Sequence, residues 1–313
     1  MKKNYFILST LFLLTACGGN PDTSSLNIVS PSGAPAVAFY NEATNERFET
    51  NSNPSNIVAM MTEASDKDIV VIDTVSGIKA IQNGAPYSLA ANITFGNFYI
   101  AATGNDDNTM MDGDDKIVLF GQGKTSDLIF HYLYGDQFDA NIEYVPAVKD
   151  AAACLATGKN AVTNSTIDYV FVAEPVLFAT LHNTNAATYG KASVYANIQE
   201  LYQEKTNGLS LIQASVFVRN ATEKKVLQTY LSDLEENIKN ALENPTLVEE
   251  GMSQIPLEQA TALYGIAPSV AKAVLADGNR LGLGYKKAID NKAAIDQFIE
   301  LFSLGQTNEE IYF

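Results

Sequence analysis

Residues 121–126, with the sequence Gly-Gln-Gly-Lys-Thr-Ser, have the composition best suited to hold a negatively charged or polar ligand. They lie between an apolar strand pattern over 116–120 and a helical pattern over 127–134. Small residues with free backbone N–H groups at a helix N-terminus form a favourable place for an anion. The spacing excludes a nucleotide-binding P-loop, because Val118 stands where that motif needs its first glycine. An ordinary turn capped by Thr125 or Ser126 fits the spacing equally well.

Glu174 is a second candidate for ligand contact. It follows an apolar strand pattern over 168–172 and precedes Pro175, which opens a helical pattern. Open α/β sheets place ligand-contacting groups at the carboxyl ends of their strands. The alternative is a structural role, because a carboxylate at a helix N-terminus is favoured by the helix dipole and Pro suits the first helical position.

Other residues capable of chemistry lack the spacing that catalysis or metal binding needs. The acidic stretch 104–115 fails the EF-hand pattern, because Met110 and Met111 stand where an oxygen ligand and the glycine should be. His131 and His182 lie within helical patterns and are interpreted as structural, and Cys154 as a small buried hydrophobe. No Gly-x-Ser-x-Gly elbow, zinc spacing or paired-carboxylate motif is present. The sequence therefore predicts no catalytic residue, no metal site and no cofactor.

The elements that would position these residues follow an α/β pattern. Short apolar strand patterns alternate with helical patterns, which predicts an α/β fold with mainly parallel sheets. About 290 residues exceed what a single small core usually holds, so two lobes are expected. From Thr222 the pattern becomes helical, and the strand over 215–219 is expected to cross back to the first lobe. The acidic stretch 104–115 is interpreted as a connection between the lobes.

The first twenty residues predict export. Lys2 and Lys3 precede an apolar run over 5–14 that is too short to span a bilayer. The following segment, Leu14-Thr15-Ala16-Cys17-Gly18, resembles the bacterial lipoprotein signal, in which the cysteine becomes the first residue and carries lipid. We therefore expect a signal peptide over 1–16, lipidation of Cys17 and a polar tether over 17–25. A plain secretory signal is the alternative.

The composition fits an exported globular protein. Hydrophobic residues make up 46% and charged residues 18% of the chain, whose formal net charge is −16. Loss of Lys2 and Lys3 with the signal would move this charge to −18. Such acidity disfavours nucleic acid and anionic lipid headgroups as partners.

Several of these segments together resemble a known family. Together they look like an ABC-transporter substrate-binding lipoprotein. The segments are the lipoprotein signal 14–18, the turn 32–36 (Ser-Gly-Ala-Pro-Ala), the unit 71–77 (Val-Ile-Asp-Thr-Val-Ser-Gly), the turn 121–126 and the unit 168–175. The most similar branch is the nitrate/sulfonate/taurine and thiamine-pyrimidine-precursor group. The resemblance implies a type II periplasmic-binding-protein fold, with two α/β lobes, a hinge, a ligand cleft and a helical C-terminal part. The first lobe would comprise 26–113 and 213–313, and the second 114–212.

The resemblance also implies which residues contact ligand. Those of the first lobe would be Ser32, Gly33, Pro35, Ala36, Asp73, Thr74 and Ser76. Those of the second lobe would be Gly123, Lys124, Thr125, Ser126 and Glu174. Secondary contacts would be Asn56, Asn97, Phe95, Tyr144 and Tyr169, with the aromatic residues ranked lower because they are more often core.

The kind of ligand is less well defined. None of the three arginines, Arg47, Arg219 and Arg280, lies in a candidate cleft loop, which argues against a guanidinium clamp on a carboxylate. Lys124 and the helix N-termini could hold a sulfonate, whereas Glu174, Asp73 and tyrosines could hold a neutral heterocycle. A small organic, vitamin-like or sulfonate-like molecule is therefore expected.

The resemblance implies a monomer outside the cytoplasm, held to the cell membrane by lipid, that delivers its ligand to an ABC permease and its ATPase. Two other classes remain. Pyrimidine-synthesis enzymes share the fold but need a cysteine- and histidine-rich site, for which only His131, His182 and Cys154 are available. A lipid-anchored sensor or surface interaction protein without a transporter is the other alternative.

Overall fold

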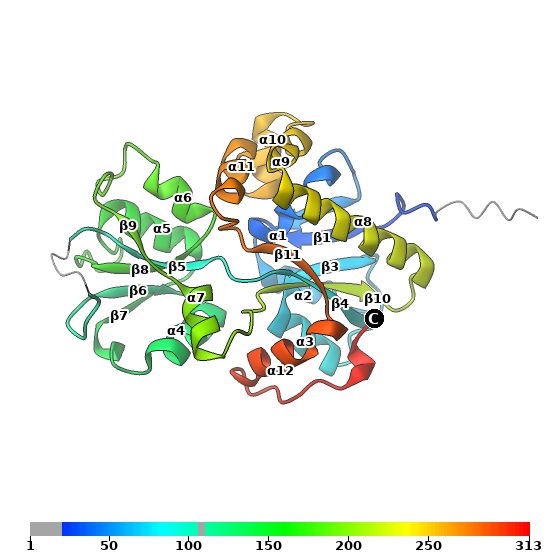
Figure 1. Cartoon of the computed structure of the whole chain (residues 1–313), viewed down its shortest axis with the longest axis horizontal. Helices are drawn as coiled ribbons and strands as arrows, with labels where there is room; N and C mark the ends of the chain where they lie inside the picture. Colours follow the sequence, from blue (N-terminus) through cyan, green and yellow to red (C-terminus); the bar gives the residue numbers. More distant parts are fainter. Residues whose placement is uncertain (1–20, 106–109) are drawn as a thin grey trace, which may run out of the picture.

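The chain forms two α/β lobes, each built on its own β-sheet (Figure 1). The structure is a computed structural model that describes residues 21–105 and 110–313. The predicted signal peptide over 1–16, the predicted lipidation site Cys17 and the first part of the predicted tether lie outside the described residues. Within the described ranges, no helix combines the length and the apolar character that crossing a membrane requires.

The first lobe contains a six-stranded sheet covered by helices on both faces. Its strands lie in the order β11 (Leu283–Lys287), β4 (Tyr87–Thr94), β10 (Ala214–Arg219), β3 (Ile69–Asp73), β1 (Ile28–Pro31) and β2 (Phe48–Asn51). The early helices are α1 (Ala34–Val37), α2 (Pro54–Ala59) and α3 (Thr74–Gln82), and the C-terminal ones are α8 (Lys224–Glu243), α9 (Thr246–Met252), α10 (Leu257–Tyr264), α11 (Pro268–Ala276) and α12 (Lys292–Glu300). Strand β3 has no polar alternation because both faces are covered: Ile69 and Val71 belong to one core cluster, and Val70 and Ile72 to the other.

The second lobe contains a five-stranded sheet. Its order is β7 (Ile142–Val145), β6 (Ile117–Phe120), β8 (Tyr169–Ala173), β5 (Phe98–Ala102) and β9 (Ser193–Asn197). Helices α4 (Thr125–Tyr134), α5 (Val148–Thr157), α6 (Val176–Leu181) and α7 (Ile198–Lys205) complete it. Cys154 is buried in α5, as the apolar pattern predicted.

The expectation of mainly parallel sheets is wrong. Parallel pairing is confined to β2-β1-β3 and β7-β6-β8, and the remaining neighbours are antiparallel. Strands β3 and β8 end where the lobes meet, whereas β10 and β5 begin there, since Ala214 pairs with Asp73 and Phe98 pairs with Ala173. A strand that enters its lobe from the other lobe must therefore run against its neighbours.

The predicted boundary at residue 113 is also wrong. Strand β5 follows β4 after only residues 95–97 and belongs to the second sheet, so the chain leaves the first lobe at these residues. The acidic stretch 104–115 joins β5 to β6 within the second lobe and does not connect the lobes. The return crossover, residues 206–213, leads into β10 of the first sheet, as expected for the strand at 215–219.

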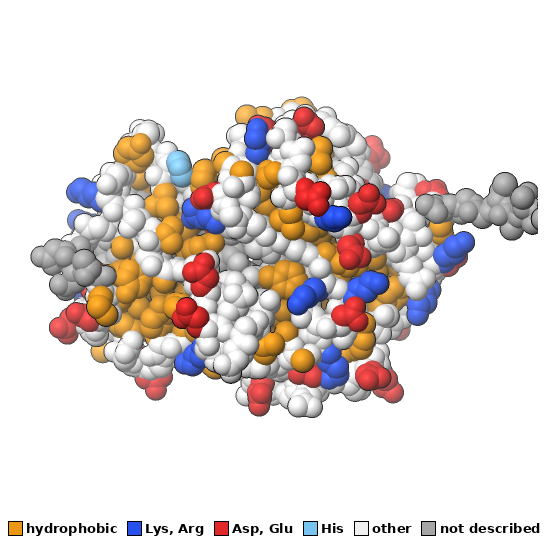
Figure 2. Space-filling model, in the orientation of Figure 1, with side chains coloured by type: hydrophobic (Ala, Val, Ile, Leu, Met, Phe, Trp, Pro, Cys, Tyr) orange, Lys and Arg blue, Asp and Glu red, His pale blue; other side chains and the backbone are white. Residues whose placement is uncertain are grey.

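The surface carries charges of both signs. Figure 2 shows Lys and Arg side chains interspersed with Asp and Glu side chains over both lobes. This face of the molecule therefore has no extended basic surface of the kind that nucleic acids bind.

Candidate ligand-binding site

The two crossover segments meet at Gln213, which ties together the start of α3 and the short connection 95–97. The carbonyl of Gln213 accepts a hydrogen bond from the Thr74 N–H (3.1 Å), and its side-chain Oε1 accepts one from the Asn97 N–H (3.1 Å). The Gln213 N–H donates to the Thr94 carbonyl (3.0 Å). These bonds fix the place where the carboxyl end of β3 meets the hinge between the lobes.

Glu174 and Arg280 form an ion pair between the lobes. The Glu174 side chain, at the end of β8, has no solvent exposure, and Arg280 lies between α11 and β11 of the first lobe. Glu174 Oε2 accepts a hydrogen bond from the Phe178 N–H (2.8 Å), and the Arg280 guanidinium lies 5.2 Å from the centre of the Tyr99 ring. Arg280, which lies in none of the predicted cleft loops, is therefore the arginine that reaches the boundary between the lobes.

Asn97 completes what we call the interlobe cluster, comprising Asn97, Glu174 and Arg280. The Asn97 side chain donates to the Glu174 carbonyl (2.8 Å), and the Glu174 N–H donates to the Asn97 carbonyl (2.8 Å). Asn97 Oδ1 and Arg280 Nε are buried and have no hydrogen-bond partner among the described residues. Arg280 Nη2 and Glu174 Oε1 meet as ions without hydrogen-bond geometry.

Such a group of buried polar atoms indicates a place for a polar ligand or ordered water. Each buried polar atom without a partner costs about 1–3 kcal/mol, so folded proteins keep few of them. The interlobe cluster offers both donors and acceptors, and both lobes contribute to it. Burial raises the pKa of Glu174, and the Phe178 N–H and the Arg280 guanidinium oppose this shift.

Asp73 and Lys124 approach each other from different lobes. Asp73 caps α3 by accepting a hydrogen bond from the Ser76 N–H (2.9 Å). Burial raises the pKa of Asp73, and the bonds to Ser76 and the positive charges of Lys124 and Lys79 counteract the rise. Lys124 is exposed at the start of α4, so its effect on Asp73 acts across the boundary between the lobes.

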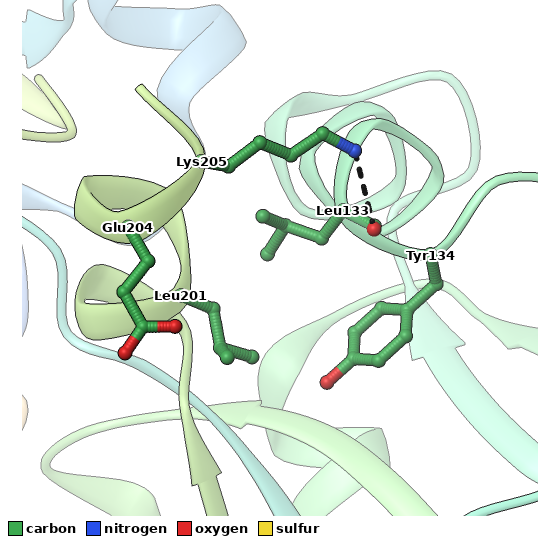
Figure 3. A pocket seen from close by; sticks show the side chains of 5 residues that line it. All are labelled: Leu133, Tyr134, Leu201, Glu204 and Lys205. Atoms are coloured by element: carbon green, nitrogen blue, oxygen red, sulfur yellow. Dashed lines mark hydrogen bonds between the residues drawn. The ribbon is translucent and has the colours of Figure 1, made fainter. Parts of the chain in front are cut away.

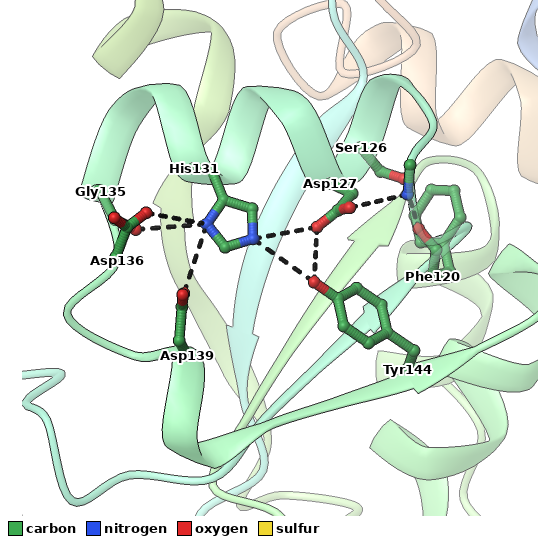
Figure 4. Close-up of polar contacts among 9 residues, drawn as sticks. Phe120, Ser126, Asp127, His131, Gly135, Asp136, Asp139 and Tyr144 are labelled. Atoms are coloured by element: carbon green, nitrogen blue, oxygen red, sulfur yellow. Dashed lines mark hydrogen bonds and ion pairs between the residues drawn. The ribbon is translucent and has the colours of Figure 1, made fainter.

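The α4 loop, residues 121–126, binds a carboxylate of its own chain (Figure 4). The Gly123 N–H donates to Asp127 Oδ2 (2.7 Å), and the Lys124 N–H donates to the Gly121 carbonyl (2.9 Å). The Ser126 hydroxyl donates to the Phe120 carbonyl. Neither Thr125 nor Ser126 is the N-cap of α4, which is Lys124 and makes no side-chain capping bond. The donors of Gly123 and Ser126 are therefore used internally, and Thr125 remains partly exposed.

The turn at the start of α1 is covered by the connection between α10 and α11. The Gly33 N–H donates to the Tyr264 carbonyl (2.8 Å), and Ala36 is fully buried. Gly265 has a φ of +70°, and a Cβ there would lie 3.1 Å from the Gly33 nitrogen. The Gly33 N–H and the Ala36 side chain are thus unavailable to a ligand, whereas Ser32 and Pro35 are partly exposed.

Thr74 belongs to a buried polar network rather than to an open surface. Its hydroxyl lies 2.6 Å from the Ser215 hydroxyl, which accepts a hydrogen bond from Asn92 Nδ2 (2.8 Å). Asn92 Oδ1 in turn accepts one from Asn291 Nδ2 (2.8 Å). Thr74 has no exposed surface in this structure, and its ligand contact stays a prediction.

The secondary candidates are dispersed. Asn56 is exposed on α2, and Phe95 lies in the first crossover, where its N–H donates to the Gly282 carbonyl (2.7 Å). The Tyr144 hydroxyl donates to Asp127 Oδ1 (2.8 Å) and so lies behind the α4 loop. Tyr169 is at the opposite end of β8 from Glu174, with its ring 4.9 Å from that of Tyr195. Among these candidates, only Asn97 joins the interlobe cluster.

Two surface cavities lie away from these residues. One of about 320 Å³ is formed between α4 and α7 (Figure 3), and one of about 400 Å³ lies beside α12. The first is lined by Leu133, Tyr134, Leu201, Glu204 and Lys205, and burial raises the pKa of Tyr134 to about 12. Neither cavity includes a residue predicted to contact ligand.

The paired lobes, the two crossovers and the polar cluster between them define a protein with the two-lobe fold of periplasmic binding proteins. No family model matches the sequence, and no curated protein matches it. Solved structures supply the comparison.

Several of the similar structures are named as ABC transporter or sulfonate-binding proteins. An ABC transporter structure from Parabacteroides distasonis is 17% identical, with a TM-score of 0.68 over 89% of this chain and 92% of that chain. The periplasmic aliphatic sulphonate-binding protein SsuA from Escherichia coli is 14% identical, with a TM-score of 0.62 over 89% and 86%. The alkanesulfonate-binding protein SsuA from Xanthomonas axonopodis pv. citri, bound to MOPS, is 12% identical, with a TM-score of 0.56 over 89% and 92%. At these identities the likeness establishes the fold.

Proposed function

We propose that this chain is an extracytoplasmic solute-binding lipoprotein of an ABC importer. It captures a small organic molecule between its lobes and delivers it to a membrane permease with a partner ATPase. The observation that carries the proposal is the interlobe cluster, because Asn97 and Glu174 of the hinge and second lobe meet Arg280 of the first lobe with buried polar atoms unpaired. The folds of the sulfonate-binding structures support it.

Ligand capture works here through closure of the lobes. A ligand that contacts both lobes binds the closed form more tightly than the open form and so shifts the population toward closure. The ion pair between Glu174 and Arg280 also links the two lobes and so favours the closed form. Polar groups of a ligand would either replace this pair or form additional hydrogen bonds to the same two side chains. Asp73 and Lys124 supply a second pair of opposite charges across the same boundary.

The ligand class follows from the groups that remain available. The exposed Lys124 favours an anionic group such as a sulfonate. The Arg280 guanidinium is already paired with Glu174 and with Asp277 (2.8 Å), so it offers a ligand only its Nε–H donor. Asn97 Oδ1 accepts a hydrogen bond from a heterocycle or amine. A vitamin-like or sulfonate-like molecule with a donor and an anionic group fits both. We propose binding rather than catalysis, with a monomeric chain anchored outside the cytoplasm through lipid on Cys17.

A thermal-shift screen of the chain from Gly18 onward tests the proposal. The panel comprises sulfonates, nitrate, pyrimidines, flavins and amino acids, and a ligand at 100 times its Kd adds about 2.7 kcal/mol to stability. We expect a hit whose affinity falls in Asn97→Ala, with Asn56→Ala as the matched control on the exposed surface of α2. A hit that Asn97→Ala does not weaken would contradict the assigned site. Silence across the panel would favour a sensor or surface protein.

The anchor is tested separately. We expect Cys17→Ser to leave the chain unlipidated and absent from the membrane fraction. Lipid labelling and membrane association equal to those of the unaltered chain would contradict it.

A further inference from the structure

The end of α4 and the connection from it to β7 contain a histidine surrounded by oxygen atoms. His131, near the end of α4, is partly exposed, with 27% of its side chain accessible. Its Nε2 lies 3.2 Å from Asp127 Oδ1 and 3.4 Å from the Tyr144 hydroxyl (Figure 4). Its Nδ1 faces the Gly135 carbonyl at 3.4 Å, Asp139 Oδ1 at 3.5 Å and Asp136 Oδ1 at 4.0 Å.

We propose that His131 Nδ1, Asp136 and Asp139 form a binding site for a divalent transition-metal ion, with Zn²⁺ as the first choice. The three side-chain ligand atoms lie within 4.8 Å of one another. Ligand atoms at about 2.0–2.2 Å from a tetrahedral zinc ion lie roughly 3.3–3.6 Å apart, close to the distances around Nδ1. The exposed side chains of Asp136 and Asp139 can close the remaining gap, and the Gly135 carbonyl offers a fourth ligand.

The other side of the imidazole ring is already arranged as it is in metal sites. A metal-ligating histidine commonly donates its second N–H to a carboxylate, which fixes the tautomer and orients the ring. Asp127 occupies this position, and it is itself held by the Gly123 N–H and the Tyr144 hydroxyl. When Nε2 donates to Asp127, Nδ1 carries a lone pair that faces the oxygens of Gly135, Asp136 and Asp139. Lone pairs that face one another repel, and a bound cation removes this repulsion because each of these atoms can then coordinate it.

The imidazole determines which ion fits best. Sites with nitrogen and carboxylate ligands suit Zn²⁺ and neighbouring transition metals, whereas Mg²⁺ and Ca²⁺ prefer all-oxygen sites. The nearby carboxylates of Asp127, Asp136 and Asp139 also supply the negative charge that a divalent ion needs. The site lies on the second lobe alone, so it does not depend on the proposed function.

The test is Zn²⁺ binding by isothermal titration calorimetry to the chelator-treated chain from Gly18 onward, which contains every described residue and lacks Cys17. We expect one equivalent to bind. His131→Gln should abolish this binding, and Asp127→Asn should weaken it by about 10–100-fold through loss of ring orientation. His182→Gln is the matched control, because His182 lies at the end of α6 and contacts Phe178 instead.

A second readout is the tautomer of His131, observed by ¹⁵N NMR of the ring. Zn²⁺ should shift the Nδ1 signal and leave Nε2 protonated. Urea unfolding of His131→Gln verifies that the variant is folded. The proposal is overturned if Zn²⁺ does not bind at about millimolar concentration, if His131→Gln binds as well as the unaltered chain, or if binding depends on His182 instead.

Discussion

The α4 loop and the interlobe cluster contain similar polar groups but differ in how these groups are used. Gly123 of the α4 loop donates to Asp127, the residue that follows the loop, and Asp127 also accepts from Tyr144. Ser126 of the loop donates to a backbone carbonyl. In the interlobe cluster, Asn97 Oδ1 and Arg280 Nε are buried without a partner among the described residues. The polar groups named at the α4 loop have hydrogen-bond partners within the chain, whereas two buried polar atoms of the interlobe cluster have none among the described residues.

The difference shows that the presence of donors does not define a ligand site. A loop with small residues at a helix N-terminus attracts an anion, and here Asp127 of the same helix is that anion. Buried polar atoms that lack protein partners are the stronger indication of a ligand, because the folded chain otherwise bears their desolvation cost. The ligand contacts of the second lobe are therefore expected near Glu174 more than near Gly123.

The largest loss in the free energy of unfolding is expected for Arg280→Met. The substitution leaves the carboxylate of Glu174 buried without its cation, and removal of one partner of a buried pair typically costs about 3–5 kcal/mol. Urea unfolding measures this loss. The double variant Glu174→Gln with Arg280→Met should recover much of it, because the unpaired charge is gone. A single variant as stable as the unaltered chain would mean that the pair does not form in solution.

Much of the fold could be predicted from sequence because its central strands are continuous apolar segments. Residues 69–72 and 117–119 are buried on both faces and bounded by turns, which the apolar runs indicate directly. The edge strands β2 and β11 were not predicted, because Phe-Glu-Thr-Asn and Leu-Gly-Tyr-Lys-Lys lack an apolar run and are half exposed. Helix α9 also lacks a clear pattern, with Gly251 near its end.

The site was predicted less completely, for a physical reason. Asn97 and Glu174 lie beside strand ends, which a sequence pattern can locate. Arg280 reaches Glu174 only because the loop between α11 and β11 folds back onto the hinge, where a Cβ on Gly282 would lie 2.6 Å from the Gly96 carbonyl oxygen. The pairing of two glycine-containing turns from distant parts of the chain is a tertiary property, and no local spacing indicates it.

Asp127→Ala tests the completeness of the α4 loop. It leaves the Gly123 N–H and the Tyr144 hydroxyl without their acceptor, and we expect a loss of about 1–3 kcal/mol in the free energy of unfolding. Asp136→Asn is the matched control, because 89% of that side chain is exposed and urea unfolding should show little change. Equal stability of Asp127→Ala and the control would indicate that the loop is solvated rather than internally bonded.

Asp73→Asn tests the charge at the lobe boundary through its pH dependence. Asn keeps the oxygen that caps α3. Because burial raises the folded-state pKa of Asp73 above its ordinary value of 3.8, the folded protein binds the proton more tightly than the unfolded chain. The stability of the unaltered chain relative to Asp73→Asn should therefore fall as pH rises from about this value through the folded-state pKa, and then level off. A relative stability that increases over this range, measured by urea unfolding at each pH, would contradict the direction of the shift.

The smallest effect is expected for Lys124→Ala, which changes the pKa of Asp73. The size of this change reports the distance between the lobes. Lys124 lowers the pKa of Asp73 from the opposite lobe, and Lys79 lowers it from the same helix, α3. Removal of either charge should raise the Asp73 pKa further, which ¹³C NMR titration of the carboxyl measures. If Lys79→Ala raises this pKa and Lys124→Ala does not, the lobes in solution stand further apart than in this structure. A ligand that closes the lobes should then restore the effect of Lys124, because the coupling of the two charges depends on their separation and on the exclusion of water between them.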